Sequence, residues 1–529
     1  MRTSQTSIGG KMTGLKRRTV LAGAAGLSGL TGFAAIAQAQ GAPRRGGTLR
    51  ISVDQAASVI HPLRTRVNPE HMVAELCYAN LTTLTTEMAP LPDLALSWSA
   101  NADFTEWTFK LRPGVKFSDG SPCTAKDVVA TYVAILDPKT ASPARSIVSM
   151  IKEPVAVDDE TVLFRLNTAY ADLPATVAVF GTRIIPASIA TGDLAKLSRE
   201  SLGCGPFKIV SYEPDRLIVL ERNPHYFMPD QPYLDRVEIR VYPDSSAETS
   251  ALLAGDNDLM AITAQSEFGR LKNVRGVDAL QVASGQFLNV NMGCDAKPFS
   301  DLRVRKALSL CVDREALVGF VALDAGKPGD DVPVNSIYRY FKKEPPKKID
   351  IAQAKKLLAE AGYPDGIDLT LVASDNPGTR TQLAVAIREM AKPAGFRITV
   401  QTMPHAAYLD QVWKKGSFYI GFYNTQQTVD GVFTLLYTSD AAWNETRWNN
   451  KDFDALVAQG RHTSDDAKRT EIYGKAQDMM YAEMPSIIPL FFDLLCGKRS
   501  YVKGYALHPR GHIYRFEKVW LDEGAPKRG

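Results

Sequence analysis

The sequence has little of what several common classes of protein need. Its 529 residues include six cysteines and seven histidines, without a C-x-x-C spacing for a metal or redox site. It lacks a G-x-S-x-G nucleophile elbow, an H-E-x-x-H zinc helix and a phosphate-binding loop. We therefore predict no enzymatic centre, no metal and no cofactor. An exported hydrolase stays an alternative, because a pair of catalytic carboxylates converges only in the folded chain.

Long apolar runs are also missing, apart from a Gly/Ala-rich stretch between Val20 and Ala37 that is too short and too weakly hydrophobic for a stable membrane span. Cationic residues precede this stretch, and an A-x-A pattern ends at Ala39. These features predict a signal peptide over residues 1–39. The pair Arg17-Arg18 favours the twin-arginine route, with the general export route as the alternative.

An excess of charge of either sign is absent once the predicted leader is set aside. The first forty residues carry five cationic side chains and no acid, so a formal charge of +4 for the chain leaves the remainder near −1. This balance argues against nucleic acid as a partner. The first cysteine, Cys77, lies too far from the cleavage region to carry a lipid on a new N-terminus. We expect an exported, soluble periplasmic protein without a lipid anchor, whose cysteines are buried free thiols or include one disulfide.

What is present is a mixed α/β pattern. Residues 107–111 alternate as a strand, and Thr124 with Asp127 forms a capping box that starts a helix reaching Leu136. Three short apolar runs predict further strands, over residues 161–166, 217–221 and 237–241. The chain is long enough for two or three domains.

The second half contains the clearest succession of elements. Asp350 caps a helix that Gly362 and Pro364 end. The elements that follow are a strand over 368–373, a helix over 379–390 and a strand over 396–402, and later a helix over 465–483 and a strand over 487–492. The strand-helix-strand unit implies parallel pairing in a doubly wound lobe. Such α/β architectures place ligands in a crevice between domains.

Five blocks of sequence carry a resemblance to a known family. The first is W-T-F-K-L-R-P-G-V-K-F-S-D-G from Trp107, continuing to Val128. The others are 203–207 with 221–224, 233–235 with 251–255, 301–314 (DLRVRKALSLCVDR) and 354–364 (AKKLLAEAGYP). Together they resemble the peptide-type (oligopeptide, dipeptide and nickel-binding) extracellular solute-binding proteins of bacterial ABC transporters.

The resemblance implies an α/β periplasmic-binding-protein fold with two lobes, an inserted domain and a ligand cleft between the lobes. By similarity, lobe I takes residues 40–77, 180–286 and 489–529, the inserted domain 78–179, and lobe II 287–488. It also implies closure of a hinge around the ligand. The expected partners are ABC permease and ATPase subunits and a small peptide or peptide-like ligand, and the protein is expected to be a monomer.

Peptide binders of this family hold the ligand's amino group with an acid three positions after an aromatic residue. Here Tyr423 matches the aromatic residue and Gln426 replaces the acid, so a free ammonium would lack its counter-charge. Asp430 is the nearby acid and either takes this role after a change of register or caps a helix. The replacement favours the alternative ligands: an opine, a modified amino acid or an oligosaccharide.

Two loops supply the other candidate ligand contacts. In the loop of residues 441–448, Trp443 and Trp448 either stack on a ligand or pack within the lobe, and Asn444 is a candidate hydrogen-bond donor to it. Near the N-terminus, the similarity places a second loop along the ligand, and its candidate contacts are Arg64, Arg66, Val67 and Asn68. The two arginines either clamp a carboxylate or belong to a solvated charged loop.

Overall fold

The computed structural model describes residues 42–528. The chain from Arg44 onward forms one compact unit. The predicted leader, residues 1–39, lies outside the described residues, so the leader and its cleavage stay predictions.

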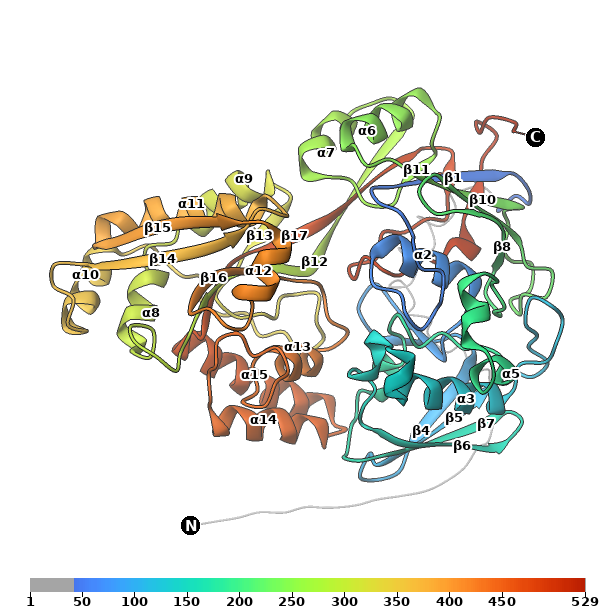
Figure 1. Cartoon of the computed structure of the whole chain (residues 1–529), viewed down its shortest axis with the longest axis horizontal. Coiled ribbons are helices and arrows are strands. Elements are labelled where there is room, and N and C mark those ends of the chain that lie inside the picture. Colours follow the sequence, from blue (N-terminus) through green and yellow to red (C-terminus); the bar gives the residue numbers. More distant parts are fainter. Residues whose placement is uncertain (1–41, 529) are drawn as a thin grey trace, which may run out of the picture. The chain divides into compact units, whose positions relative to one another are not determined.

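Separate hydrophobic cores divide this compact unit into two lobes (Figure 1). The first lobe is built around a core that includes Leu49, Phe109 and Val519, so segments from both ends of the described chain share it. The second lobe is built around residues such as Leu371 and, on the other side of its sheet, Phe433. The mixed α/β fold with two lobes agrees with the prediction.

The largest sheet runs through both lobes in the strand order β15-β14-β16-β12-β17-β11-β1-β10-β9-β8, with β13 paired to β17. Its first-lobe strands are β1 (Thr48–Val53), β8 (Phe207–Glu213), β9 (Leu217–Arg222), β10 (Arg236–Val241) and β11 (Leu259–Met260). Its second-lobe strands are β13 (Gly326–Pro328), β14 (Ile367–Ser374), β15 (Phe396–Met403) and β16 (Phe418–Tyr423). The remaining two, β12 (Val277–Met292) and β17 (Ser486–Arg499), link the lobes.

These two long strands pair antiparallel and pass from one lobe into the other (Figure 1). The strand predicted over 487–492 is longer than expected, because its apolar run continues to Cys496 and the whole length pairs with β12. The predicted lobe limits at 286/287 and 488/489 fall inside these strands, and they stay predictions. Two adjacent strands are the shared elements about which the lobes would rotate.

A smaller antiparallel sheet lies within residues 78–179, the predicted inserted domain, which stays a prediction; it shares the hydrophobic core of the first lobe and contains the start of the signature block. Its strands, in the order β4-β5-β7-β6, are β4 (Ala95–Ala100), β5 (Glu106–Leu111), β7 (Thr161–Leu166) and β6 (Ile151–Asp158). Trp107 and Phe109 of β5 are buried, as predicted. The predicted capping box also forms, since Thr124 N donates to Asp127 Oδ2 at 2.7 Å at the start of α3 (Ala125–Leu136).

The second lobe confirms the strand-helix-strand unit. β14 and β15 are parallel neighbours, and α11 (Thr379–Ala391) connects them and packs on both. Asp350 Oδ1 accepts from Gln353 N at 2.8 Å and caps α10 (Ile351–Glu360). The other helices of this lobe are α8 (Leu302–Ser309), α9 (Arg314–Ala322), α12 (His405–Gln411), α13 (Val429–Leu436), α14 (Lys451–Arg461) and α15 (Asp466–Glu483).

The first lobe also has helices and short strands that complete its surface. They are α2 (Asn68–Cys77), β2 (Thr82–Leu84), β3 (Pro90–Pro92), α4 (Leu173–Thr176), α5 (Ala187–Ala190), α6 (Ser245–Ala254), α7 (Gln265–Leu271), β18 (Val502–Lys503) and β19 (Trp520–Leu521). Within residues 42–528, no helix combines the length and apolar character needed to cross a membrane. All six cysteines are free, and all but Cys294 are buried.

Candidate functional site

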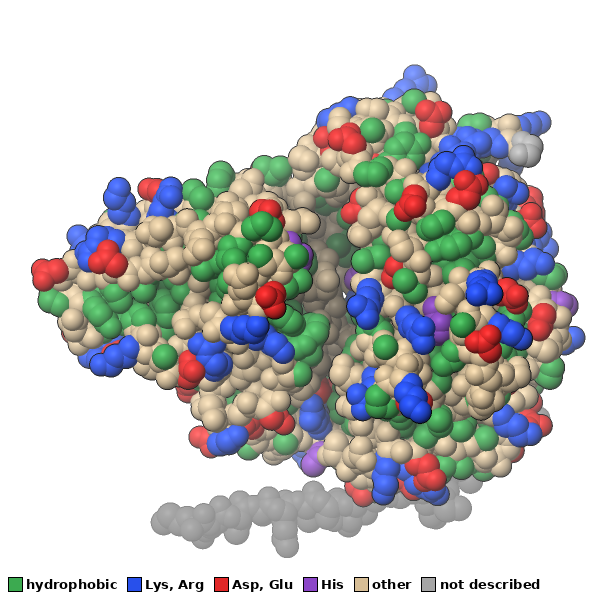
Figure 2. Space-filling view, in the orientation of Figure 1, with side chains coloured by type: hydrophobic (Ala, Val, Ile, Leu, Met, Phe, Trp, Pro, Cys, Tyr) green, Lys and Arg blue, Asp and Glu red, His purple; other side chains and the backbone are tan. Residues whose placement is uncertain are grey.

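A cavity lies in the cleft between the two lobes and takes its lining from both. The first lobe contributes Arg66, His71, Pro143, Ser146, Ile147, Phe180, Arg510 and His512. The second lobe contributes Arg380, His405, Tyr408, Leu409, Trp413, residues 421–427, Leu435, Trp443 and Glu445. Its volume of about 380 Å³ falls within the range of roughly 300–1,000 Å³ that is usual for small-molecule sites. Figure 2 shows the surface hollowed into a groove between the lobes, with Lys and Arg side chains at its margin.

Local structure positions the second-lobe wall of this cavity. Strand β16 ends at Tyr423, and the loop that follows leads to α13, whose N-cap Thr428 accepts from Gly431 N at 2.9 Å. Gln426 N donates to the hydroxyl of Tyr338 at 3.1 Å, which holds the loop in place. The backbone of this loop is therefore held by hydrogen bonds within the second lobe.

Two buried arginines face the cavity from opposite lobes without a protein partner. Arg380, in the first turn of α11, is 7% exposed, and Arg510, near the C-terminus, is 3% exposed. Within residues 42–528, neither guanidinium forms an ion pair or a hydrogen bond, and the Nε of each is left unsatisfied. Each packs on aromatic rings: Arg380 lies 5.4 Å from the ring centre of Tyr408, and Arg510 lies 5.4 Å from that of Phe180.

Burial lowers the pKa of both arginines but leaves them cationic at neutral pH. For Arg510, burial lowers the pKa to about 10, against a smaller opposing effect of Glu75. For Arg380, burial again lowers the pKa, and Tyr408 and Glu445 oppose the shift. A buried charge without a partner is costly, so the pair provides an unused capacity to bind anions.

The histidines of the cavity are neutral at physiological pH. Burial, together with the neighbouring His512 and Arg510, lowers the pKa of His71 to about 2. Burial and Arg510 lower the pKa of His512 to about 3. Burial and Arg380 lower the pKa of His405. Arg66, Arg380, Arg510 and Glu445 are consequently the residues that decide the charge of the cavity.

Glu445 is the carboxyl group that lines this cavity. It is 3% exposed, its Oε2 accepts from Asn289 Nδ2 at 3.3 Å, and its Oε1 has no hydrogen-bond partner within residues 42–528. Burial raises its pKa to about 7, while Tyr423, Asn289 and Trp413 oppose the shift. The second lobe therefore presents a cationic group and an acidic group to the same space.

Four of the ligand contacts predicted from the sequence line the cavity. They are Arg66, Tyr423, Gln426 and Trp443. Trp443 is 39% exposed and stands edge-on to Trp413, with ring centres 5.6 Å apart. Gln426 donates through its side chain to the backbone oxygen of Asn424 at 3.1 Å. These four residues stay candidates for ligand binding.

The other predicted contacts lie outside the lining of this cavity. Arg64 donates to Thr140 O at 2.9 Å, and Asn68 accepts from the hydroxyl of Tyr514 at 2.5 Å. Val67 is the N-cap of α2. These three residues belong to the support of the first lobe rather than to the cavity surface.

In the second lobe, Asn444 and Trp448 also have structural partners. Asn444 donates to the backbone oxygens of Thr438 and Trp448, at 3.1 and 2.8 Å, and so closes its own loop. Trp448 is 4% exposed, and its indole donates to Glu483 Oε2 at 2.8 Å. The structure therefore favours a role within the lobe for both residues. For Trp448, packing within the lobe was one of the two alternatives that the sequence left open.

Asp430 lies at the start of a helix, outside the lining of this cavity, and its predicted ligand role stays a prediction. It lies in the first turn of α13, where Thr428 is the cap, and Arg461 Nε donates to its Oδ1 at 2.8 Å. It lines an adjoining cavity that also includes Gln426, Trp443 and Arg461. Burial raises its pKa to about 6, against the opposing effect of Arg461. One oxygen of Asp430 is therefore paired within the second lobe, while its Oδ2 has no hydrogen-bond partner within residues 42–528.

Several residues of the cavity were missed from the sequence. Arg380 and Arg510 stand 130 positions apart in the chain, and neither lies in a recognisable motif. Glu445 lies in the loop of residues 441–448, whose tryptophans were candidate ligand contacts. An acid two positions after Trp443 was a signal that could have added it to the candidates. His71, His405 and His512 are scattered along the chain and lie in no recognisable motif.

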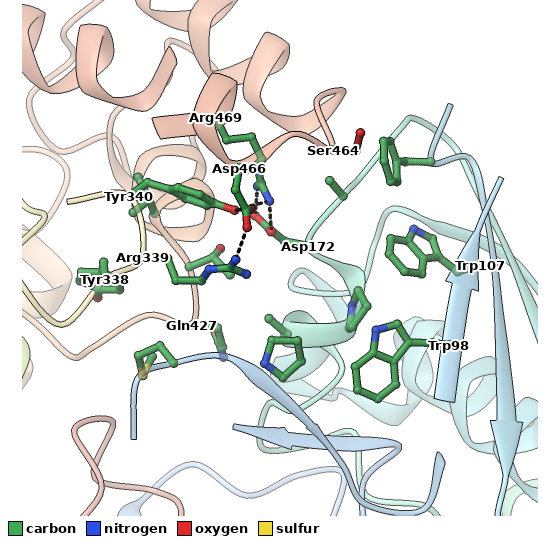
Figure 3. Close-up of a pocket in the computed structure, with 18 residues that line it drawn as sticks. Trp98, Trp107, Asp172, Tyr338, Arg339, Tyr340, Gln427, Ser464, Asp466 and Arg469 are labelled. Carbon is green, nitrogen blue, oxygen red and sulfur yellow. Dashed lines mark hydrogen bonds and ion pairs between the residues drawn. The ribbon is translucent and has the colours of Figure 1, made fainter. Parts of the chain in front are cut away.

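A second cavity lies beside the cleft, where aromatic residues of the first lobe face polar residues of the second (Figure 3). Trp98 and Trp107 lie on one side, and Tyr340 and Arg469 lie on the other (Figure 3). Arg469 donates to both carboxylate oxygens of Asp172, at 2.7 and 2.5 Å, and so joins the lobes. We call this ion pair the cross-lobe pair.

Comparison with known proteins identifies the family. The sequence profile described as "Bacterial extracellular solute-binding proteins, family 5 Middle" matches residues 89–460. The glutathione-binding protein GsiB of Escherichia coli (strain K12) is 26% identical over 465 residues, which cover 85% of this chain and 90% of GsiB.

Solved structures give the same result. The ABC transporter substrate-binding protein CtaP of Listeria monocytogenes has a TM-score of 0.82 and 27% identity, with 91% of this chain and 100% of CtaP covered. MoaA from A. tumefaciens R10, in complex with mannopinic acid, has a TM-score of 0.74 and 25% identity, with 91% and 100% covered.

The chain belongs to family 5 of the bacterial extracellular solute-binding proteins, because the family match spans more than half of its length. It is thus a solute-binding protein of the peptide type that serves ABC importers, as the sequence blocks predicted. Its relatives are substrate-binding proteins.

Proposed function

We propose that this protein captures a small acidic, peptide-like solute in the interlobe cavity and delivers it to an ABC permease. The observation that carries the proposal is the pair Arg380 and Arg510, two buried guanidiniums that face one cavity from opposite lobes without protein partners. Either guanidinium could donate two parallel hydrogen bonds to a carboxylate of the ligand. Binding to both would also hold the lobes together.

The names of two relatives support an acidic ligand. GsiB is named as a glutathione-binding protein, and MoaA was solved with mannopinic acid. Both compounds carry carboxylates. A neutral oligosaccharide would leave both arginines unpaired, so the charge of the cavity disfavours that alternative.

An opine is the second candidate ligand. The neutral Gln426 stands where peptide binders have an acid, and the likeness to MoaA extends over 91% of this chain. An opine and an acidic peptide share carboxylates and an amine, so both suit the same cavity. We further propose that the ligand is bound without turnover.

The cellular setting belongs to the same proposal. Export through the leader of residues 1–39 would place a monomeric protein in the periplasm without a lipid anchor. There it would work with permease subunits in the membrane and ATPase subunits in the cytoplasm. Closure about β12 and β17 would present the liganded form to the permease.

Calorimetry with the refolded, ligand-free protein tests the role of the arginines. The probes are glutathione, mannopinic acid and a neutral tripeptide amide. We expect at least one of the two acids to bind and the amide to bind weakly or not at all. Arg380→Met and Arg510→Met should each weaken binding of the acid, whereas Arg388→Met is the matched control, because Arg388 lies on the same helix but is exposed and pairs with Glu389. Tight binding of the amide, unaffected by either variant, would contradict the proposal.

A further inference from the structure

The buried carboxyl of Glu445 lines the cavity and has an acceptor oxygen without a partner in the described part of the chain. Its loop follows Trp443 and is closed by the side chain of Asn444, so the position of Glu445 is set by local hydrogen bonds. Oε2 is held by Asn289, and Oε1 has no hydrogen-bond partner within residues 42–528. Tyr423 and Trp413 lie near the carboxyl and act to lower its pKa, but neither forms a hydrogen bond with Oε1, so this oxygen keeps a vacant acceptor position.

The residues around Glu445 leave space for its carboxyl group. A Cβ at Gly421 would lie 2.3 Å from Asn289 Oδ1 and 2.9 Å from Glu445 Oε2, so a larger residue there would displace both Asn289 and the carboxyl that it holds. Arg380 is close enough to act against the raised pKa of Glu445, yet the two side chains form no ion pair within residues 42–528. The carboxyl and the guanidinium are thus held apart, each with capacity for a separate ligand group.

The other acids of this region are not available in the same way. Asp430 lines the adjoining cavity, and Arg461 donates to its Oδ1 at 2.8 Å and supplies a counter-charge, although its Oδ2 also has no hydrogen-bond partner within residues 42–528. Position 426 is the neutral Gln426, which accepts hydrogen bonds but supplies no counter-charge. Glu445 is therefore the acid through which this cavity can recognise a cation.

Aromatic rings border the same place. Trp443 stands 5.6 Å from Trp413 and 6.3 Å from Tyr423, measured between ring centres. Faces of tryptophan and tyrosine attract cations, including alkylated ammonium groups. An ammonium bound at Oε1 would lie beside these rings and gain from both interactions.

We propose that Glu445 binds an ammonium group of the ligand, while Arg380 and Arg510 bind its carboxylates. The ligand class is then a zwitterion, with at least one carboxylate and one free primary or secondary amine. Glu445 would thus replace, from another loop, the acid that is absent at position 426. This inference rests on the proposed function, because it assumes that the interlobe cavity holds the solute.

A competition experiment with paired probes tests this assignment. The protein is unfolded, freed of ligand and refolded, and is then given equal amounts of glutathione and N-acetylglutathione, and separately mannopinic acid and its N-acetyl derivative. Native mass spectrometry counts the retained forms. We expect the free amine to be retained over the acetylated form by about tenfold or more. In Glu445→Gln the ratio should fall to about one, because the amide supplies no counter-charge.

Glu248→Gln is the matched control, since Glu248 is a buried acid with an unpartnered Oε1 in the first lobe, away from the cavity lining. It should keep the wild-type ratio. Equal retention of the free and acetylated forms by the wild-type protein would overturn the role of Glu445 and leave the proposed function standing. Retention of none of the four probes would contradict both proposals. A wild-type ratio that persists in Glu445→Gln would assign the amine to another group and overturn the role of Glu445.

Discussion

Buried charges are treated differently in two neighbouring regions of the cleft. In the cross-lobe pair, Arg469 and Asp172 have side chains only 6% and 12% exposed and satisfy each other through two hydrogen bonds. In the ligand cavity, Arg380, Arg510 and Glu445 are as deeply buried, but within residues 42–528 they form no ion pair, whereas Arg469 leaves only its Nε without a partner. The ion pair between Arg469 and Asp172 stabilises contact between the lobes. The charged groups of the ligand cavity remain free to bind a charged solute.

The pKa values express the same contrast. Burial acts to lower the pKa of Arg469, but Asp172 outweighs it and raises that pKa. For Arg510, Glu75 opposes the effect of burial but does not outweigh it, so burial lowers the pKa to about 10. The difference between a structural and a functional arginine is thus the presence of a protein partner, not the depth of burial.

The largest expected effect comes from removing both cavity arginines. Arg380→Met with Arg510→Met should weaken binding of an acidic ligand by about 3–6 kcal/mol, since a hydrogen bond to a charged group contributes about 1.5–3 kcal/mol. Thermal unfolding of the ligand-free protein should be unchanged or raised, because an unpaired buried charge is lost. Calorimetry and a melting curve check the two parts. A ligand-free protein that melts much lower would place these arginines in the structural class.

The cross-lobe pair should behave in the opposite way. Asp172→Asn leaves Arg469 buried without its counter-charge, and breaking a buried pair costs about 3–5 kcal/mol where it cannot relax. Opening of the lobes would relieve much of this cost, so we expect a larger radius of gyration by small-angle X-ray scattering and weaker ligand binding. Asp368→Asn is the control, because its ion pair with Arg397 is exposed and lies within the second lobe. An unchanged radius in Asp172→Asn would show that this pair does not favour closure.

The pH dependence of binding should identify the acid of the cavity. The charged and titratable groups near Glu445 include Arg380, Tyr408, Tyr419, Tyr423 and Tyr437, and His405 lines the same cavity. Burial raises the pKa of each of these tyrosines and lowers that of His405, so Glu445 is the group expected to change charge near pH 7. Because the pKa of Glu445 in the free protein is about 7, affinity for an amine-bearing ligand should rise between pH 6 and 8 by several-fold. Calorimetry at several pH values measures this rise, which should vanish in Glu445→Gln. A rise that persists in the variant would assign it to another group.

The same carboxyl has an opposite effect on the stability of the free protein. A pKa raised by burial means that the folded form binds the proton more tightly than the unfolded chain does. The contribution of Glu445 to stability is therefore highest at low pH and falls as the pH rises from the ordinary range of a carboxyl to about 7. Ligand-free Glu445→Gln should lose this part of the pH dependence in denaturant titrations.

The smallest effect separates the two tryptophans of one loop. Trp443→Ala should weaken binding by about tenfold, through loss of roughly 1–1.5 kcal/mol of aromatic contact, and should leave the fold intact because the ring is 39% exposed. Trp448→Ala should instead lower stability by about 3–5 kcal/mol, because its ring is buried in the core. Calorimetry and denaturant unfolding distinguish the two, and unchanged affinity in Trp443→Ala would remove it from the site.

The fold was largely predictable because its signals are local. The capping residue Asp350, the alternation at Trp107 and the helix before Leu136 each depend on neighbours within a few positions. The length of β17 was missed because it depends on pairing with β12, some two hundred residues earlier.

The site was less predictable for the same physical reason. Arg380 and Arg510 become a pair only when two lobes meet, and the sequence around each gives no sign of its missing partner. Trp443 and Trp448 have similar neighbours in the sequence, yet one faces the cavity and the other the core. Which side of a loop faces a ligand depends on tertiary packing, so the sequence left both alternatives open.

Native mass spectrometry of the protein as purified tests the central claim most directly, by giving the mass and composition of any solute retained in the cleft. The account predicts a small zwitterion with at least one carboxylate and one free amine, released when Arg380 and Arg510 are both replaced by Met. A retained neutral solute, or a solute that stays bound to that double variant, would contradict it.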